Sequence, residues 1–214
     1  MSAKLLSIQV GLPREVEWRG KLVRTSIFKA PVEGRVRVDR LNLEGDRQSD
    51  LSVHGGRDKA VYAYPSEHYA FWKAELPDAV LAPGAFGENF TIEGLLEDRA
   101  CIGDQIRCGT AAFVVTQPRT PCFKLGIRFG RPDIVKRFQR SGRSGFYLAV
   151  LREGEVGAGD ALELVESPGE RMSVSDIARI ARDDSADPKL LRRISELPAL
   201  AESWRKHFRE RLGK

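Results

Sequence analysis

Cysteine and histidine are scarce in this chain of 214 residues, and long apolar runs are absent. The three cysteines are an odd number without Cys-x-x-Cys spacing, which argues against a disulfide framework and a structural zinc site. The histidines His54, His68 and His207 lie far apart and match no zinc-hydrolase signature. No apolar run approaches the roughly 20 residues that span a bilayer, so we expect no membrane segment.

The N-terminus also lacks the apolar stretch and the small-residue cleavage site of a signal peptide, and residues 4–10 instead predict a first strand. With 42% hydrophobic and 30% charged residues, the composition is that of an ordinary globular protein. The length allows one good-sized domain with a small appendage. We therefore expect a cytoplasmic protein.

Short alternating or β-branched segments dominate the first three quarters of the chain. They predict strands at residues 4–10, 23–28, 34–43, 60–64, 111–115 and 145–151 and a hairpin-like excursion at 11–20. Two segments, 101–108 and 156–165, each place a Gly-Asp turn before alternating residues, which suits strands that turn the corners of a closed sheet. We therefore expect a mainly β protein with some α, built on a β-barrel.

Helices are expected between these strands at residues 65–76, 123–126 and 132–140. In the first of them, aromatic residues at helical spacing predict a packing face. His68 is interpreted as a side chain on the surface of this helix.

Proline and glycine at residues 166–171 mark a boundary between residues 1–166 and an all-helical tail, 171–214. Helices are expected there at 173–181, 188–194 and 198–212. The formal net charge is +5, and the tail holds eleven basic and seven acidic residues. A helix-turn-helix is the alternative interpretation. Because the acids interrupt any phosphate-binding stripe, we expect solvated helical faces and no nucleic-acid partner.

The segment 116–122, Thr-Gln-Pro-Arg-Thr-Pro-Cys, is the most distinctive stretch of the chain. It follows the apolar strand predicted at 111–115, and its two prolines should prevent that strand from continuing. A stiff loop would then hold Arg119, Thr120 and Cys122 in fixed positions at a strand end. A guanidinium favours the thiolate form of a nearby cysteine, which binds metals or attacks electrophiles. The alternative is a small buried core cysteine.

Two polar loops with glycine, at residues 44–50 and 54–59, could bring backbone N–H groups and the cations Arg47, Arg57 and Lys59 around an anion such as phosphate. Ordinary turns have the same composition, and the spacing is not that of a P-loop. Further on, the amide of Asn89 suits recognition of a pterin or purine-like edge, or it bonds the backbone of its own turn.

Five motifs follow one another along the chain: Gly-Asp-Arg-Gln-Ser-Asp at 45–50, His-Gly-Gly-Arg-Asp-Lys-Ala-Val-Tyr-Ala-Tyr at 54–64, Gly-Glu-Asn at 87–89, Ile-Gly-Asp at 102–104 and Gln-Pro-Arg-Thr-Pro-Cys at 117–122. Together they resemble the MOSC-domain proteins, specifically the bacterial YiiM-like branch. The tail resembles the three-helix extension of that branch. The resemblance implies a β-barrel MOSC domain over 1–166 and a small all-α domain over 171–214.

In that family the cysteine of the Gln-Pro-Arg-x-Pro-Cys segment is taken as the protein ligand to molybdenum in a pyranopterin cofactor. The resemblance thus implies that Cys122 is the metal ligand and the catalytic residue, and that Arg119 and Thr120 orient the cofactor or hold its phosphate. The resemblance further implies a cofactor-binding wall that includes Asp46, Arg47, His54, Lys59 and Asn89.

The resemblance implies reduction of N-hydroxylated compounds, such as N-hydroxylated nucleobases, to amines. The sequence has no Gly-x-Gly-x-x-Gly fingerprint and no iron–sulfur cysteine set, so electrons would come from a separate flavin- or NADPH-dependent reductase. The basic tail could dock such a partner. Two alternatives remain: a non-catalytic module that carries molybdenum cofactor or sulfur, and a DNA-binding regulator.

Overall fold

Seven strands close into a barrel in the computed structural model, which describes residues 3–50, 55–167 and 169–213. The strands are β1 (Ala3–Val10), β6 (Val61–Pro65), β7 (Phe90–Glu93), β8 (Gln105–Cys108), β9 (Ala111–Pro118), β10 (Phe146–Arg152) and β12 (Ala161–Glu166). Their order around the barrel is β12-β8-β9-β10-β6-β7-β1, and a β1–β12 pairing closes the ring. The β6–β7 pair is parallel, and the other neighbours are antiparallel. The expectation of a β-barrel is confirmed.

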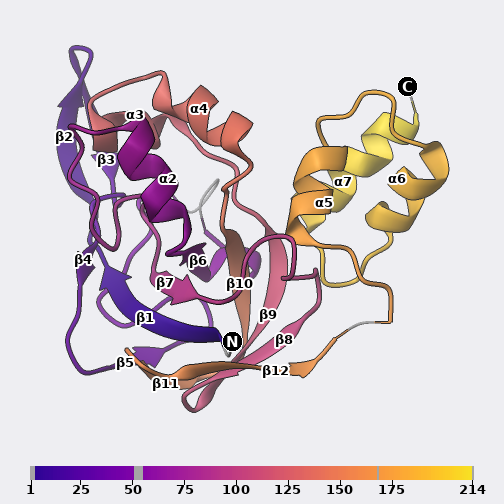
Figure 1. Cartoon of the computed structure of the whole chain (residues 1–214), viewed down its shortest axis with the longest axis horizontal. Coiled ribbons are helices and arrows are strands. Elements are labelled where there is room, and N and C mark those ends of the chain that lie inside the picture. Colours follow the sequence, from indigo (N-terminus) through magenta and orange to yellow (C-terminus); the bar gives the residue numbers. More distant parts are fainter. Residues whose placement is uncertain (1–2, 51–54, 168, 214) are drawn as a thin grey trace.

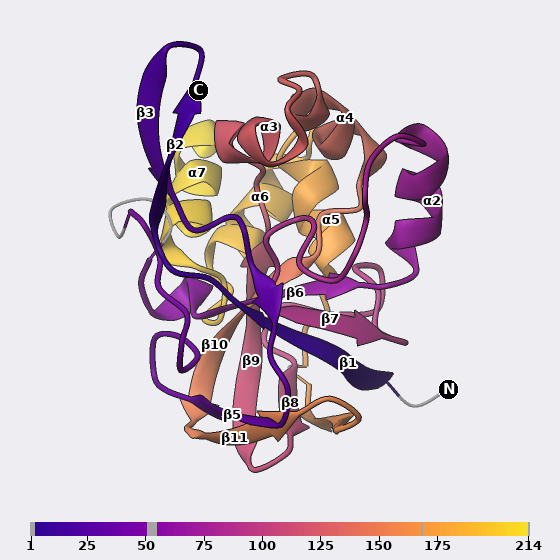
Figure 2. The same ribbon diagram turned by 90° about the vertical axis from the view of Figure 1, so that its left-hand side faces the viewer.

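Shorter strands extend the barrel at its edges. The strands β2 (Arg14–Trp18) and β3 (Lys21–Thr25) form the predicted hairpin, which projects from the body of the molecule (Figures 1 and 2). The strand β4 (Ala30–Pro31) pairs with the end of β1, and β5 (Arg35–Val38) pairs with β11 (Gly154–Gly157).

Three short helices lie at one end of the barrel, whereas the β5–β11 ribbon lies at the other end (Figures 1 and 2). They are α2 (His68–Glu75), α3 (Phe123–Phe129) and α4 (Ile134–Ser141), and a single 3-10 turn, η1 (Arg57–Lys59), precedes β6. Each of α3 and α4 ends at a glycine in the left-handed conformation, Gly130 and Gly142, which stops the helix without a Cβ penalty. Of these elements, η1 and α3 contribute residues to the lining of the site described below.

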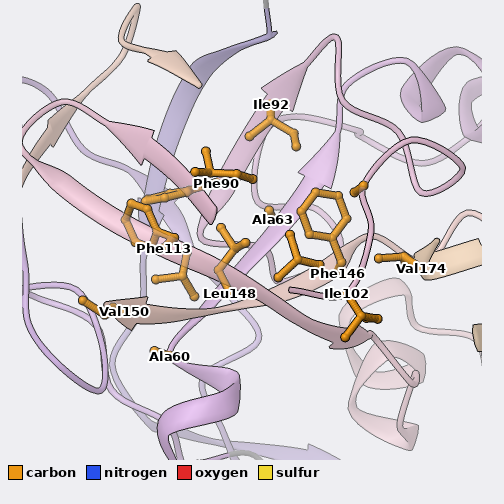
Figure 3. Close-up of a cluster of buried hydrophobic side chains, with 14 of the residues drawn as sticks. Ala60, Ala63, Phe90, Ile92, Ile102, Phe113, Phe146, Leu148, Val150 and Val174 are labelled. Carbon is orange, nitrogen blue, oxygen red and sulfur yellow. The ribbon is translucent and has the colours of Figure 1, made fainter. Parts of the chain in front are cut away.

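The barrel interior is filled by inward-facing apolar side chains. Figure 3 shows Phe90, Phe113 and Leu148 gathered between the strands, and the rings of Phe90 and Phe113 meet edge to face with centroids 5.7 Å apart. Fully burying one such side chain is worth about 1.5–3 kcal/mol. The interior is therefore a packed core, and any ligand must bind at an end or on a side of the barrel.

The tail forms the three expected helices, α5 (Val174–Ile180), α6 (Pro188–Ser195) and α7 (Glu202–Leu212). Ser173 caps α5 by accepting a hydrogen bond from the Asp176 N–H, and Asp187 caps α6. Apolar residues of these helices belong to the same buried cluster as the barrel residues. In addition, the Ala201 N–H donates to the carbonyl of Thr116 on β9. The tail therefore packs against the barrel wall.

Some predicted elements have different limits. The strand expected at 111–115 runs on to Pro118, because β9 has a bulge at Thr116 that shifts its pairing with β10, and proline is tolerated next to a bulge. The strand expected at 34–43 is limited to the four residues of β5, because the chain turns after Val38. No helix in the described ranges is long and apolar enough to cross a bilayer.

Candidate functional site

Cys122 lies where β9 has ended and α3 begins. It is the N-cap of α3 in an extended conformation, and its carbonyl accepts a hydrogen bond from the Leu125 N–H. Cys101 and Cys108 are buried, whereas Cys122 is partly exposed. Pro118 and Pro121 fix the loop that leads to it. Cys122 is thus the accessible thiol of the three.

Cys122 lines a cavity of about 100 Å³ together with Arg119, and this cavity is rich in cations. Arg119 is only 7% exposed, its backbone N–H donates to the Gly145 carbonyl, and its guanidinium lies about 5 Å from the rings of Tyr62 and Phe138. Its Nη1 atom is buried without a hydrogen-bond partner among the described residues. A buried, unpaired donor of this kind is costly, and an anionic ligand would satisfy it.

Burial lowers the pKa of Arg119, but attraction to the phenolates that Tyr62 and Tyr147 form only at high pH outweighs this effect and holds the pKa above its ordinary value. The same burial raises the pKa values of both phenols, so Tyr62 and Tyr147 stay protonated around this cation. Arg119 therefore remains charged, and Cys122 lies within its electrostatic reach.

Two further cations of this cavity were not predicted from the sequence. Lys124, two residues after Cys122 on α3, donates from Nζ to Ser49 Oγ at 2.9 Å. Lys29 forms a buried ion pair with Asp46. Burial lowers the pKa of Lys29, although Asp46 acts in the opposite direction. Proximity to Cys122 in sequence could have indicated Lys124, whereas no local pattern marks Lys29.

Asp46 lines this cavity and accepts hydrogen bonds from three different parts of the chain. Its Oδ1 accepts from the Gly11 N–H and from Lys29, and its Oδ2 accepts from the Asn89 amide at 2.9 Å. Asn89 also donates to the Gln9 carbonyl and accepts from the Tyr62 N–H. Both ends of the Asn89 amide form hydrogen bonds within the protein. Asn89 therefore stabilises the cavity wall, and its polar atoms are less available to a ligand than the sequence suggested.

The remaining expected site residues are placed in different ways. Thr120 is exposed and lines the cavity. Lys59 also lines the cavity but is partly buried, and this burial lowers its pKa. Arg47 is exposed and does not line it, because the loop turns the neighbouring residues 46, 48 and 49 inward instead. His54 lies outside the described residues.

A second space of about 200 Å³ adjoins the first and shares Lys59, Thr120, Cys122 and Tyr147 with it. Cys122 therefore lines both of two adjoining spaces. This is a suitable position for a group that is bound on one side and approached by substrate from the other.

His68 and Glu97 form a buried pair that does not line the cavity. The expectation that His68 lies on the helix surface was wrong. Its Nε2 lies 2.8 Å from Glu97 Oε2, and both side chains are buried. Glu97 also accepts from the Gly145 N–H, so the pair holds the loop to which Arg119 is bonded. A helical pattern cannot reveal a partner 29 residues further along the chain.

The donor set fits a molybdenum pyranopterin group. Cys122 would supply one soft sulfur ligand, and the cations Lys29, Lys59, Arg119 and Lys124 outnumber the single carboxylate, Asp46, among the described lining residues. The unpartnered Arg119 Nη1 is suited to a phosphate oxygen. Among the described residues there is no group of three or more metal-binding side chains of the kind that would hold a metal ion alone.

Two family models match the chain: "MOSC domain" at residues 50–163 and "YiiM-like, 3-alpha helix domain" at residues 172–214. The protein YflK of Bacillus subtilis (strain 168) is 44% identical over 95% of this chain and 92% of its own length. A protein of Gibberella moniliformis named "Reductase" is 34% identical over 91% of this chain but only 35% of its own length.

Among solved structures, the crystal structure of YiiM from Geobacillus stearothermophilus is similar to this chain with a TM-score of 0.83 and 38% identity. The similarity covers 98% of this chain and 99% of that one, so it includes both the barrel and the helical tail. The chain belongs to the MOSC-domain family, in the YiiM-like group that carries a C-terminal three-helix domain.

Proposed function

We propose that this protein is a molybdenum cofactor-dependent reductase that converts N-hydroxylated compounds, such as N-hydroxylated nucleobases, to amines. The reaction is R–NH–OH + 2 H⁺ + 2 e⁻ → R–NH₂ + H₂O. When bound, the molybdenum pyranopterin supplies the two-electron couple. The reductase name of the Gibberella moniliformis relative supports an oxidoreductase, although that protein is much longer.

One observation carries this proposal: an accessible thiol, Cys122, and a buried guanidinium with an unpartnered Nη1 line the same cavity. The thiol provides the soft ligand that molybdenum prefers. The guanidinium provides the donor for an anionic group of the cofactor. Lys124 and Lys29 add positive charge to the same wall.

Other residues of the chain would manage protons and water. Lys59 lines both spaces next to Cys122, and its lowered pKa makes its Nζ a better proton donor than an exposed lysine. Tyr62 is buried and Tyr147 is partly buried, and both would keep their protons and exclude water from the Arg119 side. The reaction consumes two protons, and the second would come from solvent through the space beside Thr120.

The test is metal and pterin analysis of the wild type and of Cys122→Ala, both expressed in a host that makes molybdenum cofactor. The wild type should hold about one molybdenum per chain, and Cys122→Ala should lose it. Cys108→Ala is the matched control, because Cys108 is buried in the barrel and does not line the cavity. Molybdenum retained by Cys122→Ala, or absent from the wild type, would contradict the proposal.

Turnover with reduced viologen and an N-hydroxylated base separates the reductase from a carrier. Amine formation by the wild type supports the reductase. Stoichiometric molybdenum without amine formation would instead favour the non-catalytic module. In the cell, the electrons would come from a separate reductase, which viologen replaces in this assay.

A further inference from the structure

A groove of about 520 Å³ lies between the barrel domain and the helical tail, and the site described above does not account for it. Its walls come from α4, from the end of α5 and from α7, and its floor includes the loop at residues 118–121. Its volume falls within the range of about 300–1,000 Å³ that is usual for small-molecule sites.

The groove is strongly basic. Lys136 and Arg140, four residues apart on α4, lie on the same helix face, and Arg182, which follows α5, also lines the groove. Lys136 and Arg140 form no ion pair within the described ranges, and no described residue of the lining is acidic. Arg182 donates to the Gln139 carbonyl and so ties the helical tail to α4. Uncompensated charge of this kind attracts an anion.

The groove also has an aromatic wall. Trp204 on α7 lines it, and Phe138 on α4 is also part of the lining, although its side chain is almost fully buried. Trp204 is backed by Phe208, whose ring centroid lies 6.2 Å away, so the indole is held in position. Flat heterocycles stack well on such an indole. Charge and aromatic surface together fit a flat ring that carries a phosphate.

The groove leads to Cys122. Pro118, Thr120, Pro121 and Trp204 line both the groove and the smaller space that Cys122 lines. A molecule that stacks beside Trp204 with its anionic end toward α4 can therefore extend its other end past Thr120 to the thiol.

We propose that this groove binds the substrate as a mononucleotide. The phosphate lies against Lys136 and Arg140, the base stacks beside Trp204, and the N-hydroxyamino group points toward Cys122. This inference rests on the proposed function for the reaction itself, but the binding step does not need turnover.

The test is calorimetric titration of the full-length protein with adenosine 5′-monophosphate, which is the amine product of an N-hydroxylated purine nucleotide. Adenosine and inorganic phosphate are the comparison ligands. The variants are Lys136→Gln combined with Arg140→Gln, and Arg137→Gln as the matched control. Arg137 is on the same helix, but it pairs with Glu75 and Asp133 and does not line the groove.

We expect the monophosphate to bind at least tenfold more tightly than adenosine or phosphate. The double variant should lose that advantage, whereas Arg137→Gln should keep it. Molybdenum content should be equal in all three proteins. Equal affinity for adenosine and its monophosphate, or wild-type affinity in the double variant, overturns the inference.

Loss of molybdenum from the double variant overturns it as well, because the groove would then hold the phosphate of the cofactor. If the wild type binds the nucleotide but holds no molybdenum, the inference about the groove is supported and the proposed function is not. The two failures are therefore distinguishable.

Discussion

Glu97 accepts hydrogen bonds from two parts of the chain: His68 Nε2 lies 2.8 Å from its Oε2, and the Gly145 N–H lies 2.6 Å from its Oε1. Gly145 in turn accepts from the Arg119 N–H. A buried carboxylate on the loop after β7 thereby connects α2 to the loop that holds the arginine of the cavity. Several properties of the protein follow from this connection.

Breaking the His68–Glu97 pair should be costly, because both side chains are at most 7% exposed. We expect His68→Phe to lower the free energy of unfolding by about 3–5 kcal/mol, since it leaves Glu97 buried without one partner. His68→Phe combined with Glu97→Leu should cost less than the sum of the single changes. Urea unfolding measures all three, and additive costs would mean that the two residues act independently.

Arg119→Met should separate stability from ligand binding. Removing a buried cation with an unpartnered Nη1 should leave the cofactor-free protein as stable as the wild type or about 1–2 kcal/mol more stable. The same change should abolish cofactor retention. Thermal unfolding of cofactor-free protein and molybdenum analysis give the two readouts. A large loss of stability in Arg119→Met would show that the guanidinium is structural.

Gly145→Ala should be among the most damaging single substitutions in the chain. Gly145 has a φ of 63°, and a Cβ there would lie 2.5 Å from the Ala63 carbonyl oxygen. We expect a loss of at least about 3 kcal/mol. Gly142→Ala is the control: its φ is 69°, but a Cβ meets nothing within 4 Å, so about 1 kcal/mol is expected. Similar melting temperatures for the two variants would contradict the clash.

The three thiols should differ in reactivity. Burial raises the pKa of Cys108 to about 12 and raises that of Cys101, which lies near Asp104, whereas Cys122 is the partly exposed one. A disulfide reagent at pH 8 should titrate one thiol per native chain and three per denatured chain. Cys122→Ala should remove the fast-reacting thiol.

The raised pKa of Cys108 also predicts a pH dependence. The unfolded chain loses this proton near pH 9, and the folded protein keeps it to about pH 12. The contribution of the protonated Cys108 thiol to the free energy of unfolding is therefore complete below pH 9. It is lost as the pH rises through about 12, by at most about 1.4 kcal/mol per pH unit. The difference in stability between wild type and Cys108→Ala, measured from pH 8 to 11, isolates this effect. A constant difference would contradict it.

Local patterns predicted the fold well, because strand alternation, helix caps and turn residues act over a few residues. Ser173 is an example: it was expected to open a helix, and it caps α5. Element limits were less accurate. The alternation at residues 34–43 continues beyond β5, but the partner strand β11 is only four residues long, and a strand ends where its partner does.

The candidate site was only partly predictable. The Cys122 loop is marked by its own prolines and by a family motif, and Lys59 and Thr120 lie near it as expected. Lys29, by contrast, reaches the cavity because the segment between β3 and β4 returns to the barrel, where β4 pairs with β1 and Lys29 meets Asp46. His68 was misplaced for the same reason. Pairs that are distant in sequence are set by tertiary packing, which no local pattern encodes.

The β1–β12 pairing joins two barrel strands that lie far apart in the sequence, with Ala3 opposite Leu162. During synthesis, β1 therefore cannot pair with β12 until nearly the whole barrel domain has been made, and only then can the ring close. Contacts of such long sequence separation make folding slow. In that interval the strand edges on either side of the gap stay open to pairing with other chains. Helices α5 to α7 follow the barrel in the sequence, so the apolar barrel wall that they cover stays exposed until they have been synthesised.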